Sequence, residues 1–376
     1  MNMEKPGSIE VFKLAPPDID HLFRRSGLNG NKLSPFQYNA EQAAVSSPSE
    51  FFKALAQSPK LNQMARCVLE PGLKIEFNRG GGGTADEKYY LLLSDDYKTM
   101  AAQFVNSEGD LLILLFDDFD AYLEWWLQIY ASTGIGSYQA VFPEVMETEV
   151  LICALHCIDI YRRSYMESML DYSGNLNLSL ATSDYVELLK RALASQDKRW
   201  LLPTVFELTP GLKNSTIALK PEHIKQIEEL GFLSNNENVL TLGERSRIMG
   251  TEFITGWMGA AGFQATALIG GEERSLSRVF MATTAFTNHL CSFENEAQGN
   301  TCFRHQALNA GELKQTLGQW MESLLKAVNR QAAAKMVGPD SAPTTVNAGS
   351  KMKFCGQCGA ELSAGKKFCT SCGTAV

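Results

Sequence analysis

Residues 111–130 read LLILLFDDFDAYLEWWLQIY, and their pattern changes from that of a strand to that of a helix. The run Leu111–Phe116 is short and entirely apolar, which indicates a buried β-strand. From about Asp118 the apolar side chains recur every three to four positions, as on one face of an amphipathic helix. Asp117, Asp118 and Asp120 stand where carboxylates cap a helix and favour its dipole, so they indicate a helix start. Carboxylate chemistry or a Mg²⁺ site there would need further partners.

Strand candidates also precede this stretch, and turns rich in Gly, Asp and Ser separate them. They are Leu73–Asn78, Lys88–Ser94 and Met100–Val105. Residues 73–130 are therefore expected to form a β-β-β-β-α series. The glycine run 80–83 is expected to be a hairpin loop, because it has neither the Lys-Ser or Lys-Thr pair nor the spacing of a phosphate-binding loop.

A similar series is expected at residues 263–328. Its helix begins near Asn309, where Asn309 and Glu312 have the spacing of a capping box. A tryptophan lies about two turns into each helix, at Trp126 and Trp320. The strand candidates of this second copy are Phe263–Ile269, Arg278–Thr284, Phe286–Phe293 and Thr301–Leu308. Either the body is pseudo-symmetric, or a common hairpin pattern occurs twice by coincidence. In both cases the fold class is α+β with antiparallel sheet.

Residues 145–255, between the two copies, are expected to be mostly helical, with helices at Glu147–Leu170 and Ser183–Ala194. Further on, Lys220–Leu230 reads as a short amphipathic helix. It is followed by the polar turn SNNEN, the strand-like VLTL and a closing helix from about residue 243. This succession makes residues 184–255 resemble part of a winged helix, and the resemblance implies contact with DNA or with protein.

Charge favours protein over DNA as the partner of this winged-helix-like stretch. A DNA-reading helix needs basic and amide side chains on its exposed face. The helix at 220–230 offers Lys220 and Lys225 against Glu222, Glu228 and Glu229. The chain of 376 residues has a formal net charge of −8, so electrostatic attraction to nucleic acid would also be weak.

Composition divides the chain into a body, a linker and a tail. Residues 331–352 lack aromatic side chains and are rich in Ala, Gly, Pro, Ser and Thr, which predicts a flexible linker. Residues 331–376 hold five Lys or Arg and two Asp or Glu, a charge of +3, which leaves −11 for the body, residues 1–330. The first twenty residues contain no apolar run of signal-peptide length, and no run approaches a membrane span, so a cytoplasmic protein is expected.

Residues 353–376 read KFCGQCGAELSAGKKFCTSCGTAV and carry the strongest chemical signal. Cys355 and Cys358 form one pair with two residues between them, and Cys369 and Cys372 form another. Four thiolates at this spacing close a tetrahedral site, which suits one structural Zn²⁺. An iron site of the rubredoxin type is the alternative, and a redox dithiol fits this double-pair spacing poorly.

These paired motifs, CGQCG and CTSCG, make residues 353–376 resemble the small zinc-ribbon family found at the ends of many bacterial proteins. Proline often follows the first cysteine of each pair in that family, and Gly356 and Thr370 stand there instead, so no ligand is lost. The resemblance implies contact with nucleic acid or protein. The zinc-loaded module would be nearly neutral, because four thiolates with Zn²⁺ sum to −2 and the segment holds three Lys and one Glu. Protein docking is the preferred interpretation.

Two further groups of residues could in principle carry chemistry. His289, Cys291, Cys302 and His305 could form a second metal site, but core cysteines with histidines at polar edges are the preferred explanation. Cys153, His156 and Cys157 share one helix, yet the sequence places no third group to orient a nucleophile.

Taken together, the sequence predicts a noncatalytic, cytoplasmic adaptor or chaperone-like protein whose tethered ribbon adds a second contact to a protein partner. The two-copy layout is loosely similar to the type VII secretion chaperones of mycobacteria, which implies holding an export substrate. A nucleic-acid-associated regulator and an enzyme with an unrecognised active site are the alternatives.

Overall fold

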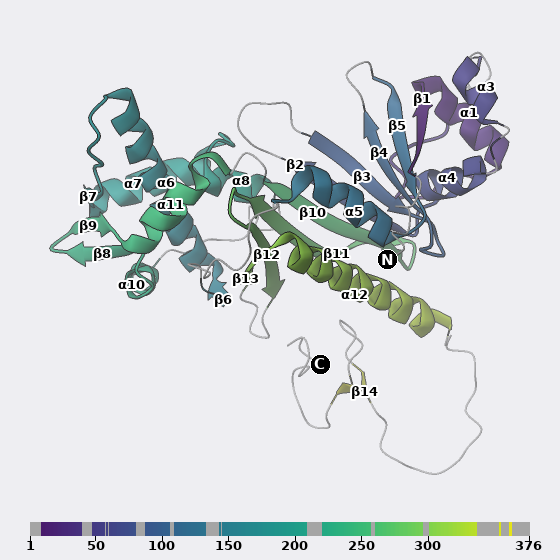
Figure 1. The fold of residues 1–376 in the computed structure, drawn as a ribbon. Coiled ribbons are helices and arrows are strands. Elements are labelled where there is room, and N and C mark those ends of the chain that lie inside the picture. Colours follow the sequence, from purple (N-terminus) through teal and green to yellow (C-terminus); the bar gives the residue numbers. More distant parts are fainter. Residues whose placement is uncertain are drawn as a thin grey trace, which may run out of the picture. The chain divides into compact units, whose positions relative to one another are not determined.

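The protein divides into two compact units (Figure 1). Residues 1–137, 256–288 and 308–333 form the first, here called the sheet unit, and residues 138–255, 289–307 and 334–376 form the second, here called the helical unit. Within the residues described, no helix is long and apolar enough to cross a membrane. The computed structural model describes residues 9–39, 47–56, 58, 60–79, 87–105, 109–132, 143, 145–208, 220–256, 260–295, 301–336, 353–354 and 361–362.

An antiparallel sheet organises the sheet unit, with strand order β1-β5-β4-β3-β2-β10-β11. The predicted α+β class is therefore confirmed. Strand β1, which the sequence pattern did not indicate, pairs with β5 at the sheet edge. The bounds are β1 Glu10–Leu14, β2 Leu73–Arg79, β3 Glu87–Leu93, β4 Met100–Val105, β5 Leu111–Phe116, β10 Ala261–Ile269 and β11 Glu272–Thr283.

The two β-β-β-β-α series meet at their first strands, because β2 pairs directly with β10. Phe77 lies opposite Phe263 in this register, and their rings are 5.1 Å apart, edge to face. Helices α5 (Phe119–Tyr130) and α12 (Ala310–Met336) follow the last strand of each series. Trp126 of α5 and Trp320 of α12 both contact the Phe263 ring, so the two helices cover the same face of the sheet.

Local sequence sets the starts of both helices. Asp118 caps α5 by accepting a hydrogen bond of 2.8 Å from the Ala121 N–H. Asn309 and Glu312 exchange two hydrogen bonds of 2.9 Å, each side chain accepting from the other residue's N–H, so the expected capping box of α12 is confirmed.

The opposite face of the sheet is covered by N-terminal helices. They are α1 (Pro16–Ser26), α3 (Glu50–Leu55) and α4 (Lys60–Leu69). Buried side chains of these helices share a core with Leu92 of β3, Ala101 of β4 and Ile113 of β5. Strand residues alternate between faces, so Leu92 meets this layer while Tyr89 hydrogen-bonds Tyr122 of α5 on the other side.

The helical unit is built around α6 (Thr148–Leu170), whose residues 148–162 are buried except for Glu149. The helices that pack on it are α7 (Thr182–Ala194), α8 (Leu201–Leu208) and α10 (Pro221–Glu229). Strands β12 (Asn288–Asn295), β13 (Thr301–Leu308) and β6 (Val145–Glu147) are hydrogen-bonded neighbours in that order. A helix buried on nearly all sides is the expected centre of such a unit.

The winged-helix-like succession is present in the helical unit (Figure 1). Helix α10 leads into the hairpin β8 (Leu233–Asn236) and β9 (Val239–Leu242), and α11 (Glu244–Gly256) follows. The two-residue hairpin loop, Glu237-Asn238, has positive φ at both positions, as tight hairpins require. Strand β7 (Ser179–Ala181) completes a three-stranded sheet in the order β7-β9-β8.

Helix α7 begins at Thr182, one residue before the expected cap Ser183. Both the N–H and the hydroxyl of Thr182 donate to the Asn238 carbonyl in the hairpin loop. A contact across 56 positions of the chain thus replaces the expected local cap.

Candidate functional site

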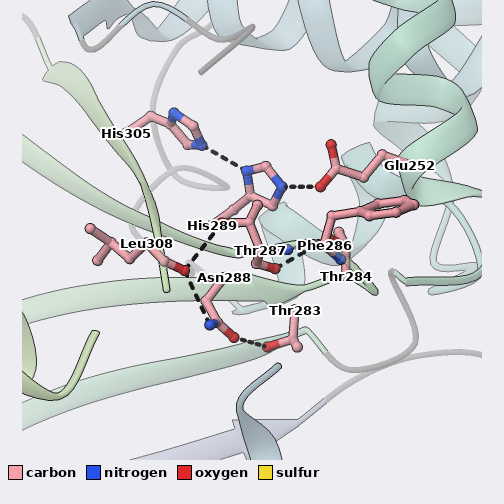
Figure 2. A network of polar contacts seen from close by, with 9 residues as sticks. All are labelled: Glu252, Thr283, Thr284, Phe286, Thr287, Asn288, His289, His305 and Leu308. Atoms are coloured by element: carbon pink, nitrogen blue, oxygen red, sulfur yellow. Dashed lines mark hydrogen bonds and ion pairs between the residues drawn. The ribbon is translucent and has the colours of Figure 1, made fainter. Parts of the chain in front are cut away.

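A chain of buried polar side chains links three elements of the helical unit (Figure 2). Glu252 of α11, His289 of β12 and His305 of β13 have 6%, 3% and 4% of their surface exposed. His289 Nε2 lies 2.9 Å from Glu252 Oε1, and His289 Nδ1 lies 2.9 Å from His305 Nε2. The His289 ring therefore bridges a carboxylate on one side and a second imidazole on the other.

Electrostatics constrains where protons lie among these three hydrogen-bonded side chains. An ionised carboxylate can only accept, so the short contact with Glu252 places a proton on His289 Nε2. Burial, together with the charge of His289, lowers the pKa of His305 to about 3, so its ring is neutral at physiological pH. The arrangement can hold one proton between the two rings and joins α11 to both strands.

A second polar network in Figure 2, within the sheet unit, is anchored by Asn288. Its side-chain N–H₂ donates to the carbonyls of Ser132 and Leu308, both at 3.2 Å. Its carbonyl oxygen accepts from the Ser132 N–H at 2.7 Å and from the Thr283 hydroxyl at 3.3 Å. A fully satisfied buried amide of this kind fixes backbone segments far apart in sequence.

The four residues considered for a second metal site are only partly brought together. His289 and His305 are in contact, and Cys291 is buried with a pKa raised by desolvation. The side chain of Cys302 lies outside the described residues. Among those that are described, no three His, Cys, Asp or Glu side chains are grouped to hold a metal ion. The expectation of histidines at polar edges was wrong, since both rings are buried and hydrogen-bonded to each other.

The Cys153, His156 and Cys157 group on α6 packs around the buried Tyr185 of α7. The Tyr185 hydroxyl donates to the Cys153 carbonyl at 3.1 Å, and the Cys157 thiol lies 3.8 Å from it. Burial raises the pKa of Cys153 to about 12 and that of Cys157 further, so both thiols stay protonated. The geometry is that of core thiols rather than of an activated nucleophile.

His156 has one ring nitrogen that is paired and one that is not. Its Nε2 faces the Tyr185 carbonyl at 3.2 Å, so Nε2 carries the proton and Nδ1 is an acceptor. Nδ1 is buried and has no hydrogen-bond partner in the described protein. Burial lowers the pKa of His156 to about 4, which keeps the ring neutral.

An apolar groove of 460 Å³ runs along α6 where His156 lines its wall. Ile160, Met166 and Leu170 of α6 form one side, and Leu188 and Ala192 of α7 face them. Trp200 and Pro203, at the start of α8, close the groove further. Its size and lining are typical of sites that receive apolar groups.

Exposed apolar side chains continue from this groove at the C-terminal end of α6. Met169, Leu170 and Tyr172 expose 62%, 78% and 97% of their surface. Large neighbouring apolar side chains in water are typical of surfaces that contact another molecule. The sequence pattern did not indicate the groove, because its walls come from three helical segments whose packing no local pattern specifies.

The acidic residues at the start of α5 either cap the helix or form ion pairs. Asp118 caps the helix, Asp120 lies 2.9 Å from Lys314 of α12, and Asp117 lies 3.6 Å from Lys60 of α4. The glycine run 80–83 lies outside the described residues.

The C-terminal segment contributes a short hairpin to the structure. Strands β14 (Lys353–Phe354) and β15 (Glu361–Leu362) pair antiparallel, with Phe354 opposite Glu361. Cys355 and Cys358 stand in the sequence between these strands, and Cys369 and Cys372 follow them. All four cysteines lie outside the described residues.

Comparison with known proteins gives a family match for this C-terminal segment alone. Residues 354–376 match the zinc-ribbon domain family. The rest of the chain has no family match, and no curated protein matches the sequence. The expected resemblance of the tail is confirmed, and four thiol donors in two closely spaced pairs are the donor set that zinc prefers.

Proposed function

We propose that this protein is a noncatalytic cytoplasmic adaptor, possessing chaperone-like character, that binds another protein through its helical unit. The observation that carries the proposal is the apolar groove along α6 with exposed Met169, Leu170 and Tyr172 at its end. Such a surface in water is stabilised when a partner covers it.

The zinc ribbon supplies the second contact in this proposal. Cys355, Cys358, Cys369 and Cys372 would hold one structural Zn²⁺, whose binding supplies the folding free energy that a segment of this size lacks. The linker was predicted to begin at residue 331, but helix α12 runs to Met336, so residues 337–352 would tether the ribbon to the body. Two weak contacts joined by a flexible tether reach useful avidity through their effective concentration.

A nucleic-acid-associated regulator is the second candidate, and the winged-helix-like succession of α10, β8, β9 and α11 favours it. The exposed face of α10 argues against it, because it presents Glu222 and Glu229 with Lys225 as the intervening cation. Lys225 lies 3.7 Å from Glu229 and is partly neutralised. A phosphate backbone would meet little net positive charge there.

A pull-down from native lysate tests the proposal. Full-length protein and residues 1–330 serve as parallel baits, in nuclease-treated lysate and in lysate without nuclease. A discrete protein partner that full-length bait retains and truncated bait holds more weakly supports the two-contact adaptor. If neither bait retains a protein partner and nucleic acid is bound when nuclease is omitted, the regulator would replace the adaptor as the proposed function.

A further inference from the structure

The groove follows α6 far enough to receive a short helix along its length. His156, Ile160, Arg163, Glu167 and Leu170 all line it and are spaced three or four positions apart. This stripe covers fourteen residue steps of α6, or about 21 Å at 1.5 Å per residue. We propose that the groove binds one amphipathic helix of a partner protein, with acidic residues beside its apolar stripe. This inference rests on the proposed adaptor function and names the partner segment.

The walls favour a helix over an extended peptide. They consist of side chains from α6, α7 and the start of α8, and among the residues that the structure describes no strand edge contributes to the lining. An extended peptide would bring unpaired N–H and C=O groups against Ile160, Leu188 and Ala192 without a backbone to pair with. A helix satisfies its own backbone and needs only apolar side chains at helical spacing.

The exposed charged side chains at the rim of the groove favour a helix with acidic residues beside its apolar stripe. Arg163 of α6 and Arg191 of α7 line the groove from opposite walls, with side chains 50% and 73% exposed. Each uses Nε toward a glutamate one turn away, Glu167 at 2.7 Å and Glu187 at 3.3 Å. A guanidinium has five N–H donors in a fixed fork, so each can also bind a carboxylate of the partner.

Site-directed photo-crosslinking in the native host tests this inference on the full-length protein. A photoreactive phenylalanine analogue replaces Ala192, inside the groove. The matched control carries it at Val186, which is on the same helix, 43% exposed and outside the groove lining. Crosslinked peptides are sequenced by mass spectrometry, and the mapped segment is synthesised as a labelled peptide.

The expected result is a crosslink from position 192, and not from 186, to one segment with apolar residues at helical spacing and acidic flanks. The synthetic peptide should bind full-length protein, and A192W, which fills the groove, should weaken it at least tenfold. R191E alters only the exposed rim and should weaken binding by roughly two- to fivefold. Circular dichroism establishes that each variant is folded.

Other outcomes overturn the inference. A partner that still co-purifies while position 192 gives no crosslink would leave the adaptor proposal standing and remove the groove as its site. A crosslink from 192 to a second copy of this chain, to an extended segment, or to an apolar small molecule detected by native mass spectrometry would each assign another occupant. Equal peptide affinity for wild type and R191E would refute the acidic flanks.

Discussion

Phe77 and Phe263 lie opposite each other on the paired strands β2 and β10, with their ring centres 5.1 Å apart. The two positions are nearly two hundred residues apart in the chain, yet they are the centre of the aromatic cluster under α5 and α12. Trp126 packs on both rings, at 6.3 Å and 5.4 Å. This pair therefore joins the first strands of the two β-β-β-β-α series.

Truncating this contact should destabilise the protein strongly. F263A removes a ring that is 6% exposed, and the cavity it leaves should lower the free energy of unfolding by about 3–5 kcal/mol. Chemical denaturation followed by tryptophan fluorescence measures the change. V11A, at a position 58% exposed on β1, is the control and should stay within about 0.5 kcal/mol of wild type. Equal effects of the two variants would contradict the packing role of Phe263.

Removing a link of the Glu252–His289–His305 hydrogen-bond chain should lower the stability of the helical unit. E252A leaves the buried His289 Nε2–H without its acceptor, at a cost of about 1–3 kcal/mol in the free energy of unfolding. E252Q keeps an acceptor oxygen and should recover part of the loss. Thermal unfolding compares both with R247A, an exposed substitution on the same helix. A stability of E252A equal to that of R247A would show that the chain contributes nothing.

Mild acid should destabilise the folded protein through His156. Its folded pKa is lowered to about 4 by burial, while an unfolded histidine titrates near 6.5. Between these values the unfolded state binds more protons, so the stabilisation present above pH 6.5 is lost as the pH falls toward 4. The slope from this residue should approach about 1.4 kcal/mol per pH unit within that window. His305, with a pKa lowered to about 3, acts in the same direction.

The variant H156Q isolates the contribution of His156, because a glutamine N–H can still donate to the Tyr185 carbonyl but does not titrate. Denaturant unfolding at intervals from pH 7 to pH 4 should show a shallower fall for H156Q than for wild type. V186Q, on the exposed side of α7, should keep the wild-type slope. Identical slopes for all three would assign the acid sensitivity to other groups.

The tail, residues 353–376, should need zinc in order to fold, and the body, residues 1–330, should not. We expect one Zn²⁺ per chain by a colorimetric zinc assay, and its loss in C355S or after chelation. Metal removal should expose residues 353–376 to protease, since the segment has too little apolar surface to fold alone. The cooperative melting transition of residues 1–330 should stay unchanged. Zinc retained by C355S, or a lower melting temperature of the body on chelation, would count against this assignment.

Local patterns in the chain anticipated the elements that depend on local interactions. The alternation and short apolar runs at residues 73–116 anticipated β2 to β5, and Asp118, Asn309 and Glu312 anticipated two helix starts. Strand β1 and helix α1 were missed, because their apolar residues are recognisable as core only when β5 and α4 are beside them.

By itself the sequence determined the α+β class, the two series of strands and the cysteine spacing that matches a zinc ribbon. Those features follow from periodicities of two and 3.6 residues, caps within one turn and ligand pairs three positions apart. Only the tertiary structure decided that β2 pairs with β10, that Glu252 reaches His289 and His305, and that α6 and α7 leave an apolar groove. Those relationships join residues far apart along the chain, and they are selected by the burial and pairing of the whole fold rather than by any local pattern.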